Sequence, residues 1–134
     1  MINFNLVGEE AYVSFETAKR LKEKGFDEDT IGYYNSISEI PERIKFFDSP
    51  ISIYHSSGLI GCIQAPTQQM VMRWLRKVHN IKVNIFYSNP NYTIEYFEPN
   101  TQTGVGKFVF IGDGYDVYEQ ACEVAINYCL DNLI

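Results

Sequence analysis

Four polar or basic side chains recur at helical spacing within residues 65–85, APTQQMVMRWLRKVHNIKVNI. They are Gln69, Arg73, Arg76 and Lys77. Residues at i, i+4 and i+7 share one face of a helix, so this face could bind an acidic protein or the backbone of a nucleic acid. The alternative is a solvated face, whose late cations interact favourably with the helix dipole. Met72 falls at the edge of this face, where an exposed methionine favours a protein contact over a phosphate contact.

The residue types that usually perform enzyme chemistry are few and scattered. The chain has two histidines, His55 and His79, and three cysteines, Cys62, Cys122 and Cys129. Their spacing matches no zinc site, and no nucleophile elbow or ordered triad surrounds His55. His79 falls at the end of the predicted helix, where an imidazolium suits the terminal carbonyl groups. We expect no catalytic residue, no metal site and no cofactor, although a buried His79 within hydrogen-bonding distance of Cys62 would indicate an enzyme.

Trp74 and the cysteines fit structural roles. Trp74 lies on the apolar side of the predicted helix, opposite the arginines, which predicts a place in the core. Cys122 and Cys129 are separated by about 10 Å along one predicted helix, too far for a disulfide. We interpret all three cysteines as free thiols in a reducing cytoplasm.

Aromatic side chains make up 15% of the chain, and many fall on predicted strands. Those on strands are Phe86, Tyr87, Tyr92, Tyr96, Phe97, Phe108 and Phe110. Since side chains alternate between the two faces of a strand, about half of these rings must pack against helices. The other half could form a dimer or partner surface, or stack the bases of a single-stranded nucleic acid.

Length, composition and charge limit the classes of function. A chain of 134 residues, 46% apolar and 21% charged, is typical of one globular domain. No apolar run approaches the roughly 20 residues of a membrane helix, and residues 1–10 lack a signal-peptide pattern. We therefore expect a cytoplasmic protein with no membrane partner. The net charge of −6 disfavours non-specific binding to nucleic acid, because a polyanion is repelled.

The first half of the chain predicts one helix followed by short strands. Residues 14–24 predict a helix with Ser14 as its N-cap. Its predicted stop is Gly25, where the chain leaves the helix in the left-handed conformation. After this helix the patterns are weak, and prolines interrupt any long element. We expect short strands and loops there, including a small hairpin at 51–54 and 59–63.

The second half of the chain begins with a helix predicted over residues 66–79. Pro66 suits its first turn, and Asn80 followed by Ile81 predicts another left-handed stop. The apolar stripe of this helix consists of Met70, Val71, Trp74, Leu75 and Val78. Their spacing places them on a single face, which we expect to be the buried one.

Three strands and a last helix complete the predicted core. Alternating side chains predict a hairpin whose turn is at residues 88–91, followed by a third strand at 106–111. The Gly-Asp-Gly sequence at 112–114 predicts a turn. Asp116 is the predicted N-cap of a helix over residues 117–132. Together with the helix before the hairpin, these elements predict the order α-β-β-β-α.

Four groups of residues carry a resemblance to a known family. The first runs from Ser14–Ala18 to Gly25–Phe26, and the second is Ala65–Gln68. The third combines Trp74–Arg76 with His79–Ile81, and the fourth runs from Tyr118–Glu123 to Leu130. This combination resembles a family of small proteins of unknown activity that are carried by phages and mobile elements of gut bacteria. The resemblance spans most of the chain, and residues 35–63 match least. It implies a genomic setting and no catalytic activity.

The α-β-β-β-α order is also similar to that of the double-stranded-RNA-binding domain. In that family, paired lysines at the start of the second helix bind the phosphates of the RNA backbone. Here the corresponding positions hold Val117, Tyr118, Glu119 and Gln120. A carboxylate at this place repels phosphate, so the resemblance extends to the topology and not to the phosphate-binding residues.

The sequence therefore predicts a single α+β domain over residues 1–134. An antiparallel meander of three or more strands, with two helices on one face, forms an α-β-β-β-α core at 65–134. Residues 1–64 add the N-terminal helix and an irregular region of short strands. The leading functional hypothesis is a non-enzymatic binding or accessory protein of phage or mobile-element origin that acts through a protein interface, which could be that of a homodimer. The alternative is an RNA- or single-stranded-DNA-binding module that uses the basic face of the helix at 66–79.

Overall fold

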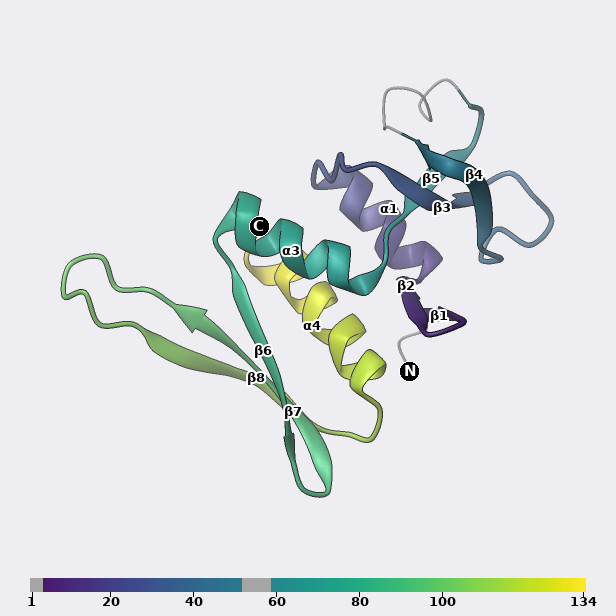
Figure 1. The fold of residues 1–134 in the computed structure, drawn as a ribbon. Coiled ribbons are helices and arrows are strands. Elements are labelled where there is room, and N and C mark those ends of the chain that lie inside the picture. The colour runs from purple at the N-terminus through teal and green to yellow at the C-terminus, as the bar shows by residue number, and fades with distance from the viewer. Residues whose placement is uncertain (1–3, 52–58) are drawn as a thin grey trace. The chain divides into compact units, whose positions relative to one another are not determined.

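The computed structural model describes residues 4–51 and 59–134. The fold class is α+β with antiparallel sheets, as predicted (Figure 1). The chain divides into two compact units, Met1–Gln68 and Gln69–Ile134. The prediction of a single domain stays a prediction, and the units are described in turn.

The first unit opens with a hairpin that the sequence patterns did not reveal. Strand β1 (Phe4–Val7) pairs antiparallel with β2 (Glu10–Val13). Each strand has four residues, which is too short for a clear alternation of apolar and polar side chains. The hairpin leads directly into the first helix.

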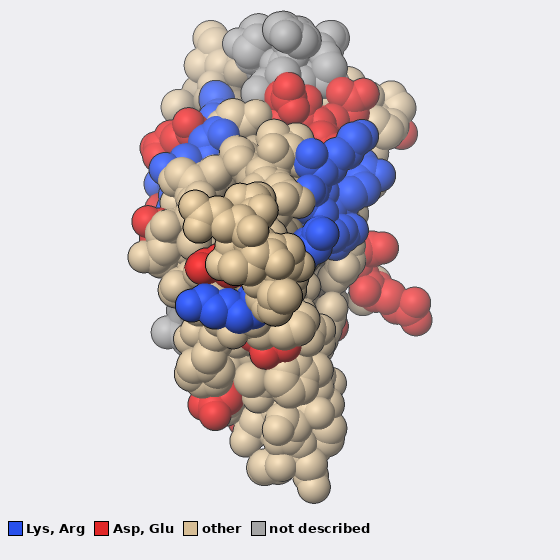
Figure 2. Space-filling view, turned by 90° about the vertical axis from the view of Figure 1, so that its left-hand side faces the viewer, with Lys and Arg blue, Asp and Glu red and all other residues tan. Residues whose placement is uncertain are grey.

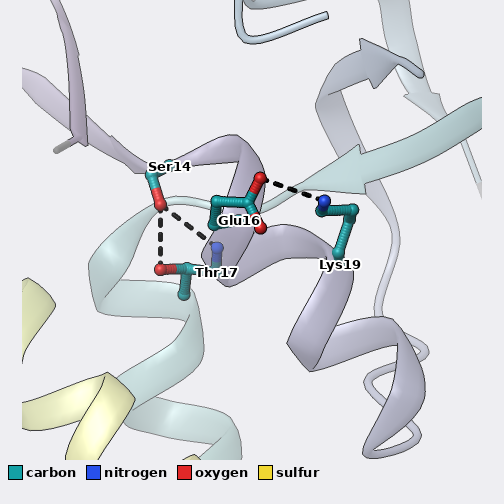
Figure 3. A network of polar contacts seen from close by, with 4 residues as sticks. All are labelled: Ser14, Glu16, Thr17 and Lys19. Atoms are coloured by element: carbon teal, nitrogen blue, oxygen red, sulfur yellow. Dashed lines mark hydrogen bonds and ion pairs between the residues drawn. The ribbon is translucent and has the colours of Figure 1, made fainter. Parts of the chain in front are cut away.

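Helix α1 (Phe15–Glu23) has the ends that the sequence predicts. The Ser14 hydroxyl accepts a hydrogen bond from the Thr17 N–H at 3.1 Å, and Glu16 forms an ion pair with Lys19 at 3.0 Å (Figure 3). At the other end Gly25 has a φ of 88°. The Phe26 N–H donates to the Leu21 carbonyl at 3.0 Å, which is the long bond of a Schellman motif. Both caps are therefore confirmed.

The second sheet of this unit has the order β4-β3-β5. It consists of β3 (Thr30–Asn35), β4 (Lys45–Ile51) and β5 (Cys62–Ala65). Ile51 and Cys62 both pair with β3, opposite Thr30 and Asn35. The predicted hairpin between them is therefore wrong where it is described, while its residues 52–54 lie outside the described residues. Pro50 belongs to β4, an edge strand, where a residue without an N–H is tolerated.

Tyr34 connects three elements of the first unit. Its ring is fully buried and packs edge-on against Phe15, with ring centroids 5.6 Å apart. Its hydroxyl donates to the Val13 carbonyl at 2.5 Å and accepts from the Asn5 amide at 2.7 Å. The N-terminal hairpin, α1 and the second sheet therefore meet at one side chain.

Helix α3 (Gln68–His79) begins two residues later than predicted. Pro66 does not occupy its first turn: the Pro66 carbonyl accepts a hydrogen bond from the Val13 N–H at 3.1 Å, and Thr67 bridges to Tyr12. These backbone contacts hold the two residues before the helix in an extended conformation. The predicted stop is confirmed, since Asn80 has a φ of 54° and the Ile81 N–H donates to the Leu75 carbonyl at 2.9 Å.

The buried side of α3 is rotated from the predicted stripe. Trp74 is buried as expected, but Val78 is 60% exposed and Met72 only 7% exposed, the reverse of the prediction. Gln68 is also fully buried, and it shares a helix side with Met72, four residues on. The predicted stripe was centred on apolar residues alone and left out the buried Gln68. It was therefore displaced around the helix axis, toward the exposed Val78.

The second unit contains the predicted meander. Strands β6 (Lys82–Ser88), β7 (Asn91–Glu98) and β8 (Lys107–Tyr115) form an antiparallel sheet in the order β6-β7-β8. The predicted turn at 112–114 is wrong, because β8 continues through it to Tyr115, opposite Tyr92. The register shifts on both sides of the pair Ile94 and Gly112, so the glycine-rich segment forms irregularities within the strand.

Helix α4 (Tyr118–Asn132) follows as predicted but without the predicted cap. Its N-cap is Val117, which makes no side-chain cap hydrogen bond. The Asp116 carboxylate instead accepts a hydrogen bond from the Asn91 amide at 2.6 Å. Helix α4 contacts all three strands of the sheet, and Figure 1 draws α3 and α4 on the same side of it.

Candidate interaction surface

The four residues predicted as a basic helix face are all on the surface. Gln69, Arg73, Arg76 and Lys77 of α3 are exposed. In Figure 2, lysine and arginine side chains gather in separate groups with acidic side chains beside them, and much of the drawn face carries neither. The exposure agrees with both predictions for these residues, a binding face and a solvated face. Met72 does not extend this face, because it is buried.

The cysteines have the structural character that the sequence predicts. Cys62, Cys122 and Cys129 are buried free thiols. Burial raises the pKa of Cys122 and of Cys129 to about 12, and burial also raises the pKa of Cys62. At neutral pH these groups are protonated, and a thiol is a far weaker nucleophile than a thiolate.

Of the two histidines, only His79 lies among the described residues. The His79 ring packs edge-on against Trp74, with centroids 4.6 Å apart, and its Nε2 atom is buried without a hydrogen-bond partner. His55 lies outside the described residues. Within residues 4–51 and 59–134, no group of three or more histidine, cysteine, aspartate or glutamate side chains could hold a metal ion.

The register of the β6-β7-β8 sheet assigns each aromatic ring to a face, since directly paired residues project to the same side. Tyr92 contacts Tyr118 of α4, and Tyr96 contacts Tyr128 of α4, with ring centroids 5.7 and 6.1 Å apart. These contacts define the helix face of the sheet, which also carries the fully buried Ile94. Burial raises the pKa of the Tyr96 phenol.

The opposite side of the sheet carries the phenylalanines. Phe97 is paired with Phe108 on β8, and their rings contact edge-on at 5.4 Å. Phe110 is paired with Glu95, and Phe86 with Thr93, which places all four rings on this side. The exposed fractions of Phe86, Phe108 and Phe110 are 38%, 58% and 62%. We call this surface the open face, and its directly paired members are Phe86, Phe97, Phe108, Phe110, Lys82, Asn84, Ser88, Asn91, Thr93 and Glu95.

The ring of Phe97 packs closely against the backbone at Gly106. A Cβ atom added at Gly106 would overlap Phe97 Cζ and would lie 2.8 Å from the Glu98 carbonyl oxygen. Only glycine leaves room for the ring at this point. The aromatic surface therefore extends to the start of β8, next to Val105, which is 73% exposed.

The polar side chains of the open face balance one another. The Asn84 amide donates to Glu95 Oε1 at 3.0 Å. Lys82 is paired with Phe97, and this pair is next to the Asn84–Glu95 pair on the same face of the sheet. The directly paired residues of the face thus include one cation and one anion beside four phenylalanines, and these two charges cancel.

The sequence predicted that about half of the strand aromatics would be outside the core, but it did not identify which. The alternation within the hairpin separates Phe86 from Tyr87 and Tyr96 from Phe97. The faces of Phe108 and Phe110 depend on the pairing of β8 with β7, where the register shifts. Local alternation therefore assigns the hairpin rings only.

Comparisons of this chain with protein-family models, curated proteins and solved structures find no match. Among the described residues, no helix is long and apolar enough to cross a membrane.

Proposed function

We propose that this protein is a non-enzymatic binding or accessory protein that acts in the cytoplasm through a protein interface. The observation that carries the proposal is the open face of the β6-β7-β8 sheet, with its exposed phenylalanines. Apolar side chains clustered on a surface are typical of interaction sites. The resemblance to proteins of phages and mobile elements supports an accessory role of this kind.

The composition of the open face favours a polypeptide ligand over a nucleic acid. Phenylalanine is enriched in the buried centres of protein interfaces. A surface that stacks single-stranded bases also needs positive charge along the phosphate backbone. The open face has only Lys82 for that purpose, and Glu95 offsets its charge. An apolar protein surface therefore matches this face better than a polyanion does.

Photo-cross-linking in cells tests the proposed interface. A photoreactive phenylalanine analogue in place of Phe110 is expected to link covalently to a discrete polypeptide, which gel electrophoresis and mass spectrometry would detect. The matched control carries the same analogue at Val78, which is as exposed as Phe110 but lies on α3. Equal labelling at both positions, or no protein adduct at position 110, would contradict the proposal.

A second candidate function is the binding of RNA or single-stranded DNA by the basic face of α3. The exposure of Gln69, Arg73, Arg76 and Lys77 supports it. If it is correct, replacing Arg73 and Arg76 by glutamate abolishes binding of a labelled oligonucleotide in a fluorescence-anisotropy titration. Each phosphate contact contributes about 0.7 to the salt slope, so neutral replacements of the two arginines reduce that slope by about 1.4. Replacing Lys22 and Lys24, which are exposed on the first unit, by glutamate is the control of equal charge change.

A further inference from the structure

We infer that the open face binds the open face of a second copy of this chain, around a two-fold axis. This inference rests on the proposed function, because it names the partner of the same surface. In a two-fold interface the same patch occurs on both sides, so it must be complementary to itself.

The charge of the chain disfavours self-association over most of its surface. Two copies with a net charge of −6 repel each other, and this repulsion is weakest where the surfaces in contact have no net charge. The open face is such a surface, since Lys82 and Glu95 are the charged residues among its directly paired members and have opposite charges. Within one chain, Lys82 and Glu95 are diagonal neighbours on adjacent strands, and such neighbours lie about 7–8 Å apart. A two-fold arrangement that places Lys82 of one protomer opposite Glu95 of its partner forms this pair twice.

The size of the face sets the strength of the expected dimer. The eight residues of β7 span about 27 Å, and three strands are about 14 Å wide including their spacing. The footprint is therefore roughly 380 Å², about half of the ~800 Å² per partner in a standard stable interface. The exposed rings of Phe108 and Phe110 enlarge the contact area beyond this flat estimate. A reversible dimer with a dissociation constant in the micromolar range is expected.

Sedimentation of the purified full chain over a wide concentration range tests the inference. The wild type is expected to shift from monomer to dimer with increasing concentration. The replacement Phe110→Ser should raise the dissociation constant at least tenfold, because the change is present on both protomers. Val78→Ser, at an equally exposed position on α3, should leave it within about twofold of the wild type. Circular dichroism would verify that each variant is folded.

Charge reversal distinguishes the two-fold pairing from a contact within one chain. Lys82→Glu and Glu95→Lys are each expected to weaken self-association about tenfold or more, because each leaves like charges opposite one another. An equimolar mixture of the two variants should associate at least as well as the wild type, since each supplies the charge that the other lacks. A contact within one chain cannot produce this recovery on mixing.

The outcomes separate this inference from the proposed function. A wild-type chain that stays monomeric at several hundred micromolar, together with a different polypeptide cross-linked at Phe110 in cells, overturns the homodimer and leaves the protein interface in place. A monomeric chain with no adduct at Phe110 contradicts both. Mixed charge variants that associate no better than either variant alone also overturn the two-fold pairing.

Discussion

The buried hydroxyl of Tyr34 gives a quantitative prediction about the first unit. The replacement Tyr34→Phe keeps the ring contact with Phe15 but removes the donor to the Val13 carbonyl and the acceptor for the Asn5 amide. Val13 is fully buried, so its carbonyl would lose this partner where water is excluded, whereas Asn5 is half-buried. Leaving a buried acceptor unsatisfied costs about 1–3 kcal/mol. We predict a loss of unfolding free energy of about 2 kcal/mol.

Urea denaturation followed by circular dichroism measures this loss, with Tyr33→Phe as the control. Tyr33 is half-buried and stacks on Phe47, with centroids 4.2 Å apart, so removal of its hydroxyl is expected to change stability by less than about 0.5 kcal/mol. A loss below about 0.5 kcal/mol for Tyr34→Phe, or equal losses for the two variants, would refute the reasoning.

The same experiment also tests the prediction of a single domain. The only tryptophan, Trp74, lies in the second unit. If the chain unfolds as one domain, Trp74 fluorescence shifts together with the circular dichroism when Tyr34 is replaced. Separate domains would leave the fluorescence transition unchanged.

Three further predictions concern the glycines and the thiols. Gly25→Ala should lower the unfolding free energy by about 1 kcal/mol, because an alanine is strained at a φ of 88°; an unchanged urea midpoint would contradict this. Gly106→Ala should cost about 1–3 kcal/mol in the same assay, since the new Cβ meets the Glu98 carbonyl oxygen as well as the movable ring of Phe97, and a stabilised variant would disprove the close approach. Burial raises the pKa of Cys122 and Cys129 from 9.0 to about 12, so the unfolded chain releases their protons first as the pH rises and stability should fall between about pH 9 and 12. In titrations of stability against pH, a double replacement of both thiols by alanine should flatten this fall, and an equally steep fall without them would exclude the thiols as its cause.

The features that the sequence predicted correctly are determined by neighbours in the chain. The Ser14 cap, the Gly25 stop and the Asn80 stop each depend on residues within one helical turn, and all three occur in the structure. The wrong predictions involve distant partners. Asp116 was expected to cap α4, but its carboxylate binds Asn91, 25 residues away in the chain. The segment 112–114 continues a strand because β7 pairs with it.

The same distinction between near neighbours and distant partners in the chain applies to the candidate surfaces. The exposure of Arg73 and Arg76 was predictable from helical spacing alone. The membership of the open face required the register between β7 and β8, which places Phe108 and Phe110 beside Phe97 and Glu95. The sequence of residues 106–115 alone does not predict that register. The register depends on which residues of β7 lie opposite the glycine-rich part of β8, where the pairing shifts on both sides of Gly112.

The proline in β4 affects how this protein behaves when it is crowded. An edge strand with regularly spaced free N–H groups can recruit a strand from another molecule, which is a route to fibrous aggregates. Pro50 interrupts that row on β4, and the exposed Asp48 beside it adds a charge. The sequence of β4 itself therefore disfavours strand addition at this edge. A protein protected in this way can tolerate a high local concentration, because growth by strand addition is discouraged at that edge of the first unit.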